Sequence, residues 1–193
     1  MTSLQVQDLR LSQHPLSEAL PSLSKRDRRR LQQGQIVVTG QSGTYTIHGL
    51  VSAAPETAWS VLNDFSGFAQ FLPTVVSSRV VESNGDRSVV EQVDQRKVFF
   101  QEINSTVRTE NIRHDQQIDF HMIEGDLRQM EGFWRIDAIA ADSENDASEQ
   151  VLVTQKVSAQ AGMGVFDGVF FKIFEGSVKE NMKAICQEIT RRD

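Results

Sequence analysis

The sequence predicts an α+β fold in which a curved antiparallel sheet of seven strands wraps around one long C-terminal helix. Three observations favour this fold. Residues 75–160 divide into closely spaced strand-like segments with no helical crossover, and short connections join antiparallel neighbours. Residues 36–52 alternate like a first strand, and two short helical segments follow them. Residues 164–191 have the period of a long amphipathic helix, the only element large enough to cover one face of the sheet.

The first 34 residues differ in charge from the remainder of the chain. They hold six of the 20 basic residues and three of the 26 acidic ones. Ser24 suits the N-cap of a short helix that ends at Gly34, and this helix has almost no apolar face. One interpretation is a solvated extension, and the other is a contact for anionic lipid head groups. The second interpretation depends on five basic residues in six positions, Lys25, Arg26, Arg28, Arg29 and Arg30.

The next segment has the period of a β-strand and leads into two short helices. Residues 36–52 form either one long strand or a hairpin, because residues 40–43 (GQSG) have the composition of a turn. Pro55 suits the first position of a helix. Ser66 is expected to cap a second short helix, which Pro73 ends.

Six further strands are expected between the short helices and the last helix. Turn compositions such as Asn84-Gly85-Asp86 separate several of them. Residues 142–149 hold four carboxylates and are expected to form an exposed loop. The expected strands cover residues 75–83, 87–98, 101–113, 116–124, 129–140 and 150–160.

The last helix is expected to be apolar around nearly its whole first half, which predicts burial on several sides. Gly162, Gly164 and Gly168 lie at its start, and each glycine inside a helix costs about 1 kcal/mol relative to alanine. This weak start predicts a segment that opens as a lid. The apolar stripe advances by three or four residues through Met163, Phe170, Phe171, Phe174, Val178, Met182, Ile185 and Ile189.

Three stretches carry a family resemblance that covers residues 36–190. They are VSAAPETAWSVLNDF at 51–65, FAQFLP at 68–73, and IEGDL with MEGFWRI within 123–136. They resemble the strand-to-helix entry, the short second helix and a hairpin of the START/polyketide-cyclase superfamily, and within it of the coenzyme Q-binding START-domain family. The resemblance implies a helix-grip fold that holds a lipophilic molecule between sheet and helix. It divides the chain into an extension at 1–34 and a START-like ligand-binding domain at 35–193.

The candidates for a cavity lining come from two strands and the last helix. Ile118, Phe120 and Met122 share one strand face, and Met130 and Trp134 share a face of the next strand. Plain core packing explains each of these positions equally well. The expected cavity residues are Phe120, Met122, Trp134, Met163, Phe166, Phe170 and Phe174.

The sequence offers no catalytic constellation, no metal site and no cofactor motif. The four histidines lack metal-ligand spacing, and there is neither a nucleophile elbow nor a P-loop. A cyclase needs polar side chains inside an apolar cavity. His121, Glu91, Arg108 and Arg135 are candidates by type, but alternation with apolar neighbours places them on the solvated face.

Composition narrows the class of function further. The net charge of −6 argues against a nucleic-acid partner. No run of 18 apolar residues occurs, and a single cysteine, Cys186, fits a cytoplasmic protein. The resemblance then implies a carrier or chaperone for an isoprenoid quinone or another lipid. A polyketide cyclase or aromatase that acts in the same cavity is the alternative.

Overall fold

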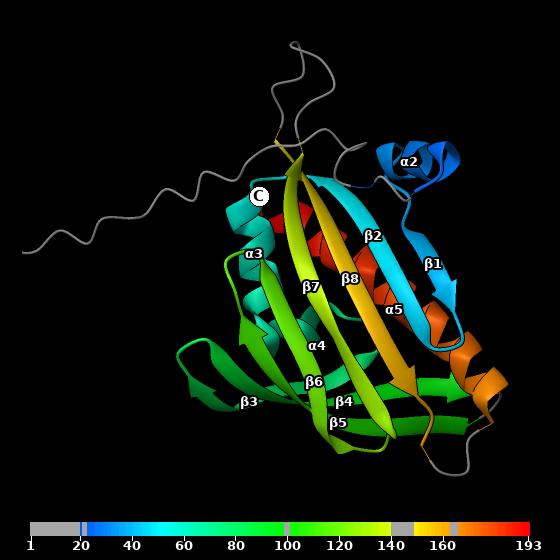
Figure 1. Ribbon diagram of the computed structural model, residues 1–193. Helices are drawn as coiled ribbons and strands as arrows, with labels where there is room; N and C mark the ends of the chain where they lie inside the picture. The colour runs from blue at the N-terminus through cyan, green and yellow to red at the C-terminus, as the bar shows by residue number, and fades with distance from the viewer. Residues whose placement is uncertain (1–19, 21–22, 99–100, 140–148, 163–165) are drawn as a thin grey trace, which may run out of the picture.

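The computed structural model describes residues 20, 23–98, 101–139, 149–162 and 166–193. Within them the chain forms an eight-stranded sheet of antiparallel neighbours in the order β1-β2-β8-β7-β6-β5-β4-β3. The long helix α5 (Asp167–Arg192) lies behind β2 and β8 in Figure 1. Strands β3 to β5 run in a different direction from β6, β7 and β8 and cross near the lower ends of these strands in that view. The strands are β1 (Val37–Gln41), β2 (Thr44–Ser52), β3 (Val75–Asn84), β4 (Arg87–Val98), β5 (Gln101–Arg113), β6 (Gln117–Gly125), β7 (Gln129–Ile139) and β8 (Gln150–Gln160).

Residues 36–52 contain a hairpin, which corrects the expected number of strands from seven to eight. Gln41 pairs with Thr44, so Ser42 and Gly43 form a two-residue turn. Both have positive φ, 54° and 87°, as this type of tight hairpin turn requires. A Cβ at Gly43 would collide with the backbone carbonyl oxygen of Ala159 on β8 and would lie 2.7 Å from the ring of Phe171, so close packing also demands glycine.

The six strands expected between residues 75 and 160 are present as β3 to β8. Their bounds differ from the expected ones by at most one residue. Of the acidic loop expected at residues 142–149, residues 142–148 lie outside the described residues. Among the residues that the structure describes, no helix is both long enough and apolar enough to cross a membrane.

Three short helical segments connect β2 to β3. They are α3 (Pro55–Asn63), η1 (Phe65–Gly67) and α4 (Phe68–Phe71). Pro55 begins α3 as expected. Asp64, and not Ser66, caps the following turn, because the turn begins at Phe65 and Asp64 directly precedes it. The backbone N–H of Gly67 donates to Asp64 Oδ1 at 3.1 Å.

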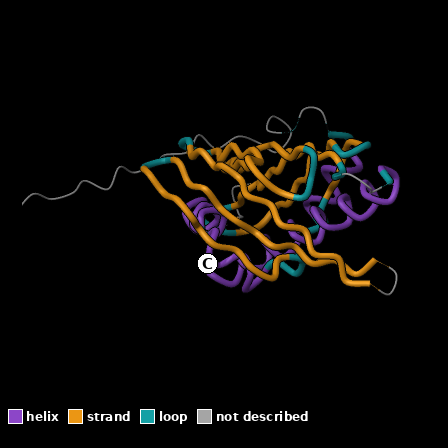
Figure 2. The backbone as a smooth tube through the Cα atoms, turned by 90° about the horizontal axis from the view of Figure 1, so that it is seen from below, coloured by secondary structure: helices purple, strands orange, loops and turns teal. Residues whose placement is uncertain are grey.

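The main hydrophobic core lies between the sheet and the second half of α5. Met182, Ile185 and Ile189 follow helical spacing on one face and are completely buried. This face of α5 packs against β2 and α3. Figure 2 traces the strands from below, together with the helices that pack against them. Burial of this face therefore fixes the helix on the sheet.

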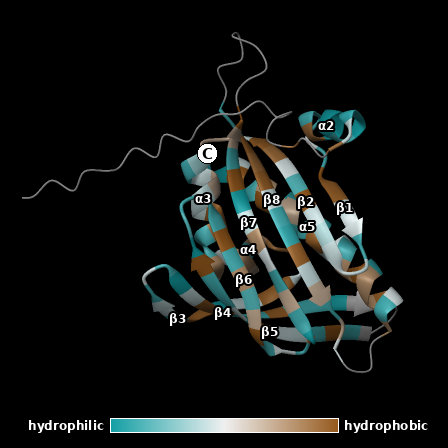
Figure 3. Ribbon diagram, in the orientation of Figure 1, coloured by the Kyte–Doolittle hydropathy of each residue, from teal (hydrophilic) through white to brown (hydrophobic). Residues whose placement is uncertain are grey.

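A smaller apolar cluster covers part of the outer face of the sheet. Helix α2 (Lys25–Gln32) begins at the expected cap, where Ser24 Oγ accepts a hydrogen bond from Asp27 N at 3.1 Å. Leu31 is 1% exposed and packs with Leu23 and Leu152. Figure 3 shows α2 as a mainly hydrophilic helix beside β1. Leu31 within the helix, together with Leu20 and Leu23 before it, thus holds a basic helix on the sheet surface.

His48 of β2 is a buried histidine in the sheet. It is 5% exposed, and its Nδ1 lies 3.1 Å from Thr154 Oγ1 on β8. Burial, together with the positive charge of Arg135, lowers the pKa of His48 to about 4. The folded protein therefore resists protonation of this side chain, whereas the unfolded chain accepts the proton near the usual pKa of 6.5.

We expect the free energy of unfolding to fall as the pH is lowered from about 6.5 to about 4. Protonation of His48 favours the unfolded chain throughout this window, by about 3 kcal/mol at pH 4. Urea unfolding as a function of pH measures the loss. His48→Gln cannot titrate, so its unfolding free energy should depend less on pH. Identical pH dependence of the two proteins would contradict the assignment.

Candidate functional site

A cavity of about 320 Å³ lies between the inner face of the sheet and the stretch of α5 from Phe170 to Ile185. Its walls come from η1 and α4, from β3 to β8 and from one side of α5. The lining is mainly apolar, and aromatic rings supply much of it. Six of these rings belong to Phe65, Phe68, Phe120, Trp134, Phe170 and Phe174.

The structure brings four of the seven expected cavity residues together in this wall. Phe120 and Trp134 come from the neighbouring strands β6 and β7. Phe170 and Phe174 come from consecutive turns of α5. Strand alternation and helical spacing therefore place these four side chains on the side of the sheet and of the helix that faces the cavity.

Phe166 lies outside the cavity wall, which corrects the expectation from helical spacing. Helix α5 begins at Asp167, later than the expected start at residue 164. Phe166 is its N-cap with an extended backbone (φ −71°, ψ 125°), and it is 84% exposed. Phe166 and Phe170 are four residues apart, and this spacing would place them on one face only if Phe166 also had helical backbone geometry. Met163 and Gly164 lie outside the described residues.

Met122 also lies outside the wall, and this expectation needs a second correction. Met122 pairs with Thr109, a lining residue, so the register of β6 would allow it to face the cavity. Its Sδ, however, lies 3.2 Å from the position that a Cβ on Gly125 would occupy. The register of β5 and β6 shifts between Arg108 and Thr109, and such a bulge redirects a nearby side chain.

Ring contacts hold the start of α5 beside β2. The rings of Phe170 and Phe174 stack with centroids 5.4 Å apart and planes 12° apart. Phe174 also lies 6.1 Å from the ring of Tyr45. The Tyr45 hydroxyl donates to the carbonyl oxygen of Phe171 at 3.3 Å. The helix start is thus attached to the sheet although the Phe170 and Phe174 rings are only half-buried.

A polar network at one edge of the cavity is a feature that the sequence analysis missed. Arg96 Nε donates to Ser177 Oγ of α5 at 2.6 Å. Its Nη1 donates to the carbonyl oxygens of Thr74 and Gln95 at 3.0 and 2.9 Å, and its Nη2 donates to Asp94 Oδ1 at 3.3 Å. A guanidinium has five N–H groups. The network uses four of them, so one N–H remains for another acceptor.

Asp94 is the acidic member of this network. Thr74 Oγ1 lies 3.2 Å from Asp94 Oδ1 and 2.9 Å from Asn181 Oδ1. Burial raises the pKa of Asp94, although the positive charge of Arg96 opposes this effect, and burial lowers the pKa of Arg96. Within the described part of the chain, Asp94 Oδ2 accepts no hydrogen bond. This oxygen and the remaining Arg96 N–H are therefore available at the cavity edge.

The sequence contained one signal for this network. Asp94 and Arg96 are two residues apart on a strand and so share a face with Val90, which is 1% exposed. The signal is weak because Glu91 and Gln95 make the opposite face polar as well. With polar residues on both faces, β4 shows no clear alternation.

The four polar residues considered for cyclase chemistry do not lie in the cavity wall. Arg108 and Glu91 form an ion pair at 2.6 Å on the outer face of the sheet. His121 Nε2 lies 3.5 Å from Glu110 Oε2 on the adjacent strand β5, and Arg135 Nε lies 3.0 Å from Asp137 Oδ2 on its own strand β7. The two arginines thus pair with carboxylates, and none of the four residues lines the cavity.

The fold, an antiparallel sheet packed against a long C-terminal helix, is a START-like α+β fold. Residues 51–186 match the family described as polyketide cyclase / dehydrase and lipid transport, so the chain belongs to this family. A search of curated proteins finds no match to the sequence.

Several solved structures share the fold at low sequence identity. A START superfamily protein from Mycobacterium smegmatis has a TM-score of 0.63 and 17% identity, over 79% of this chain and 99% of that chain. A STAR-related lipid transfer protein from Xanthomonas axonopodis has a TM-score of 0.60 and 13% identity, over 80% and 92%. The Zhui aromatase/cyclase from Streptomyces sp. R1128 has a TM-score of 0.57 and 20% identity, over 82% and 96%. These similarities establish the fold and do not choose between binding and catalysis.

We expect Phe174→Ala and Met182→Ala to destabilise the protein by different amounts. Met182 is completely buried, so its replacement should cost about 2–5 kcal/mol. Phe174 borders the cavity, so its replacement should cost clearly less than the roughly 3–5 kcal/mol that is usual for a buried phenylalanine. Urea unfolding of both variants measures the costs. A loss for Phe174→Ala within that full range would show that its ring belongs to the closed core.

Proposed function

We propose that the protein binds a lipophilic small molecule in the cavity between α5 and the sheet. The observation that supports this proposal is an apolar cavity of about 320 Å³ with a polar edge. Small-molecule sites commonly measure about 300–1,000 Å³ and combine an apolar wall with a few placed polar groups. Protein interiors otherwise contain few voids larger than a water molecule. The aromatic wall suits an apolar body, and Arg96 with Asp94 suits a polar end.

The ligand that we propose is an isoprenoid quinone or another lipid with an oxygen-bearing head group. The remaining N–H of Arg96 can donate to a carbonyl or hydroxyl oxygen, and Asp94 Oδ2 can accept from a hydroxyl. The quinone is suggested by the sequence resemblance to the coenzyme Q-binding START-domain family. In this proposal the protein carries or chaperones the ligand, and no covalent bond is made or broken.

A polyketide cyclase or aromatase is the alternative, because the cavity edge holds a carboxyl group of raised pKa beside a cation. Such a carboxyl transfers protons closer to neutral pH, and a cation stabilises charge that develops on a carbonyl oxygen. We favour binding because four of the five N–H groups of Arg96 are engaged by the protein itself. This side chain serves first to join β4 to α5.

Protein purified from its native host is expected to carry a lipid that organic extraction and mass spectrometry identify. A short-chain isoprenoid quinone added to the emptied protein should quench tryptophan fluorescence, since Trp134 lies in the cavity wall. Phe170→Ala removes an aromatic wall residue and should weaken quinone binding about twofold to tenfold. Phe166→Ala is the matched control, because Phe166 is exposed and lies outside the wall.

Two outcomes would oppose this proposal in different ways. Recovery of no lipid, together with no binding of added quinone, would contradict lipophilic binding. Turnover of a linear poly-β-keto substrate, lost in Asp94→Asn, would instead favour the cyclase alternative. Asp94→Asn retains the size of the side chain and removes its proton exchange.

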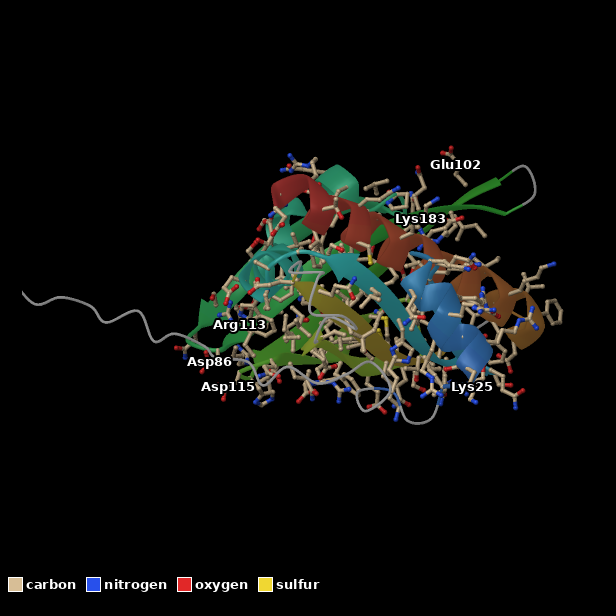
Figure 4. The ribbon with its side chains drawn as sticks, turned by 90° about the horizontal axis from the view of Figure 1, so that it is seen from above. Lys25, Asp86, Glu102, Arg113, Asp115 and Lys183 are labelled. Carbon is tan, nitrogen blue, oxygen red and sulfur yellow. The ribbon has the colours of Figure 1, made fainter. Side chains whose placement is uncertain are left out.

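We also propose that the basic face of α2 contacts an anionic membrane surface. Leu31 packs on the sheet and fixes the orientation of α2. The basic side chains of the helix therefore lie at a defined position on the surface. Figure 4 shows Lys25 at the end of the molecule away from Asp86 and Asp115. Positive charge near a membrane surface contributes about 1 kcal/mol for each basic residue. The acidic protein would thereby present one basic region to anionic lipid.

Replacement of Lys25, Arg26 and Arg29 by alanine should reduce cosedimentation with vesicles that contain phosphatidylserine. These three side chains are exposed, so the fold should persist, and circular dichroism checks it. The loss should be large at low salt and disappear at high salt, where binding itself is screened. The matched control replaces three exposed lysines of α5, Lys172, Lys179 and Lys183. An equal loss in the control would show that only net charge matters.

A further inference from the structure

Gln155 is a buried amide within an apolar row on the cavity side of β8. It is 8% exposed, and it lies between Val153 and Val157, which are 0% and 2% exposed. In the register of the sheet it stands beside Ile47 of β2 and Trp134 of β7. The side chain of Gln155 forms part of the cavity wall. A glutamine at this position places a strongly polar group among apolar neighbours.

The amide oxygen of Gln155 is buried and has no hydrogen-bond partner among the described residues. Such an arrangement is unfavourable, and buried polar atoms nearly always have a partner. Asn111 is another buried amide in the same wall, and its nitrogen is satisfied locally. Its Nδ2 donates to Thr109 Oγ1 at 3.0 Å and to the Thr109 carbonyl oxygen at 3.1 Å. The cavity wall thus contains one amide whose nitrogen the protein satisfies and one whose oxygen has no partner in the described part of the chain.

We propose that Gln155 selects ligands that carry a hydroxyl group on an apolar body. This specificity rests on the proposed binding function. A hydroxyl both donates and accepts, so it satisfies the amide in either orientation of its oxygen and nitrogen. A carbonyl oxygen only accepts, and a methyl group does neither. The cavity therefore favours an alcohol or phenol over a ketone or hydrocarbon of the same size, and a hydroquinone over the corresponding quinone.

The Gln155 position is separate from the polar edge at Arg96. In the order of the sheet, β8 and β4 are separated by β7, β6 and β5. Both side chains nevertheless belong to the wall of one cavity. The two positions therefore address different parts of one ligand, the hydroxyl at Gln155 and a second oxygen at Arg96.

Two probes of matched size test this specificity, 2-naphthol and 2-methylnaphthalene. Gln155→Leu should weaken binding of 2-naphthol about threefold to tenfold, the range for one hydrogen bond, and should not weaken binding of 2-methylnaphthalene. The intrinsic fluorescence of the probes reports both affinities. Gln92→Leu is the matched control, because Gln92 also lines the cavity but is only partly buried. It should change both affinities by the same factor.

The stability of the ligand-free variant provides a second readout. Removal of an unpartnered buried amide should raise the Tm of Gln155→Leu by about 2–4 °C, whereas loss of an internal hydrogen bond would lower it. A lower Tm, or equal weakening of both probes, overturns the role of Gln155 while leaving the binding function intact. Failure of the wild-type protein to bind either probe overturns the binding function, and the specificity with it.

Discussion

The structure depends on the uneven packing of α5 against the sheet. In the second half of the helix, Met182, Ile185 and Ile189 are completely buried, and removal of this apolar surface from water is the main force that holds the helix. In the first half, Phe170 and Phe174 are only half-buried and are held by ring contacts. Because the buried residues of the second half secure the helix, the earlier turns can border a cavity, whose wall ends at Ile185. One helix therefore serves both as core and as cavity wall.

The polar network lies where these two halves meet. Ser177 and Asn181 are one helical turn apart on α5, and through Arg96 and Thr74 they connect the helix to β4 and to the residue before β3. A charged pair in a partly buried place is costly unless hydrogen bonds surround it, and most of the Arg96 guanidinium is so surrounded. The amide oxygen of Gln155, by contrast, has no hydrogen-bond partner among the residues that the structure describes. Arg96 is therefore a side chain that the fold needs, whereas Gln155 is one that a ligand would satisfy.

The turn compositions and the close spacing of the strand-like segments predicted β3 to β8 well, because each of these strands is long. Short connections between them permit only antiparallel pairing. The sequence could not place the start of α5, since its N-cap residue, Phe166, makes no side-chain capping hydrogen bond and gives no capping signal. The alternation of apolar and polar residues along the strands also failed to predict the polar residues of the cavity wall. Arg96 lies on a strand with two polar faces, and Gln155 lies on β8, where apolar clusters bury both faces. On such strands hydropathy does not reveal which side a residue faces.

The fold and family are compatible with either a lipid carrier or a cyclase, and both depend on a cavity that stays open. Crystals exposed to pressurised xenon test this point most directly, because xenon enters apolar cavities and is located by its anomalous scattering. Xenon should bind beside Phe120, Trp134 and Phe174, with α5 in place against β2. Absence of xenon, with these three rings packed into contact, would show a closed core and would exclude an open cavity.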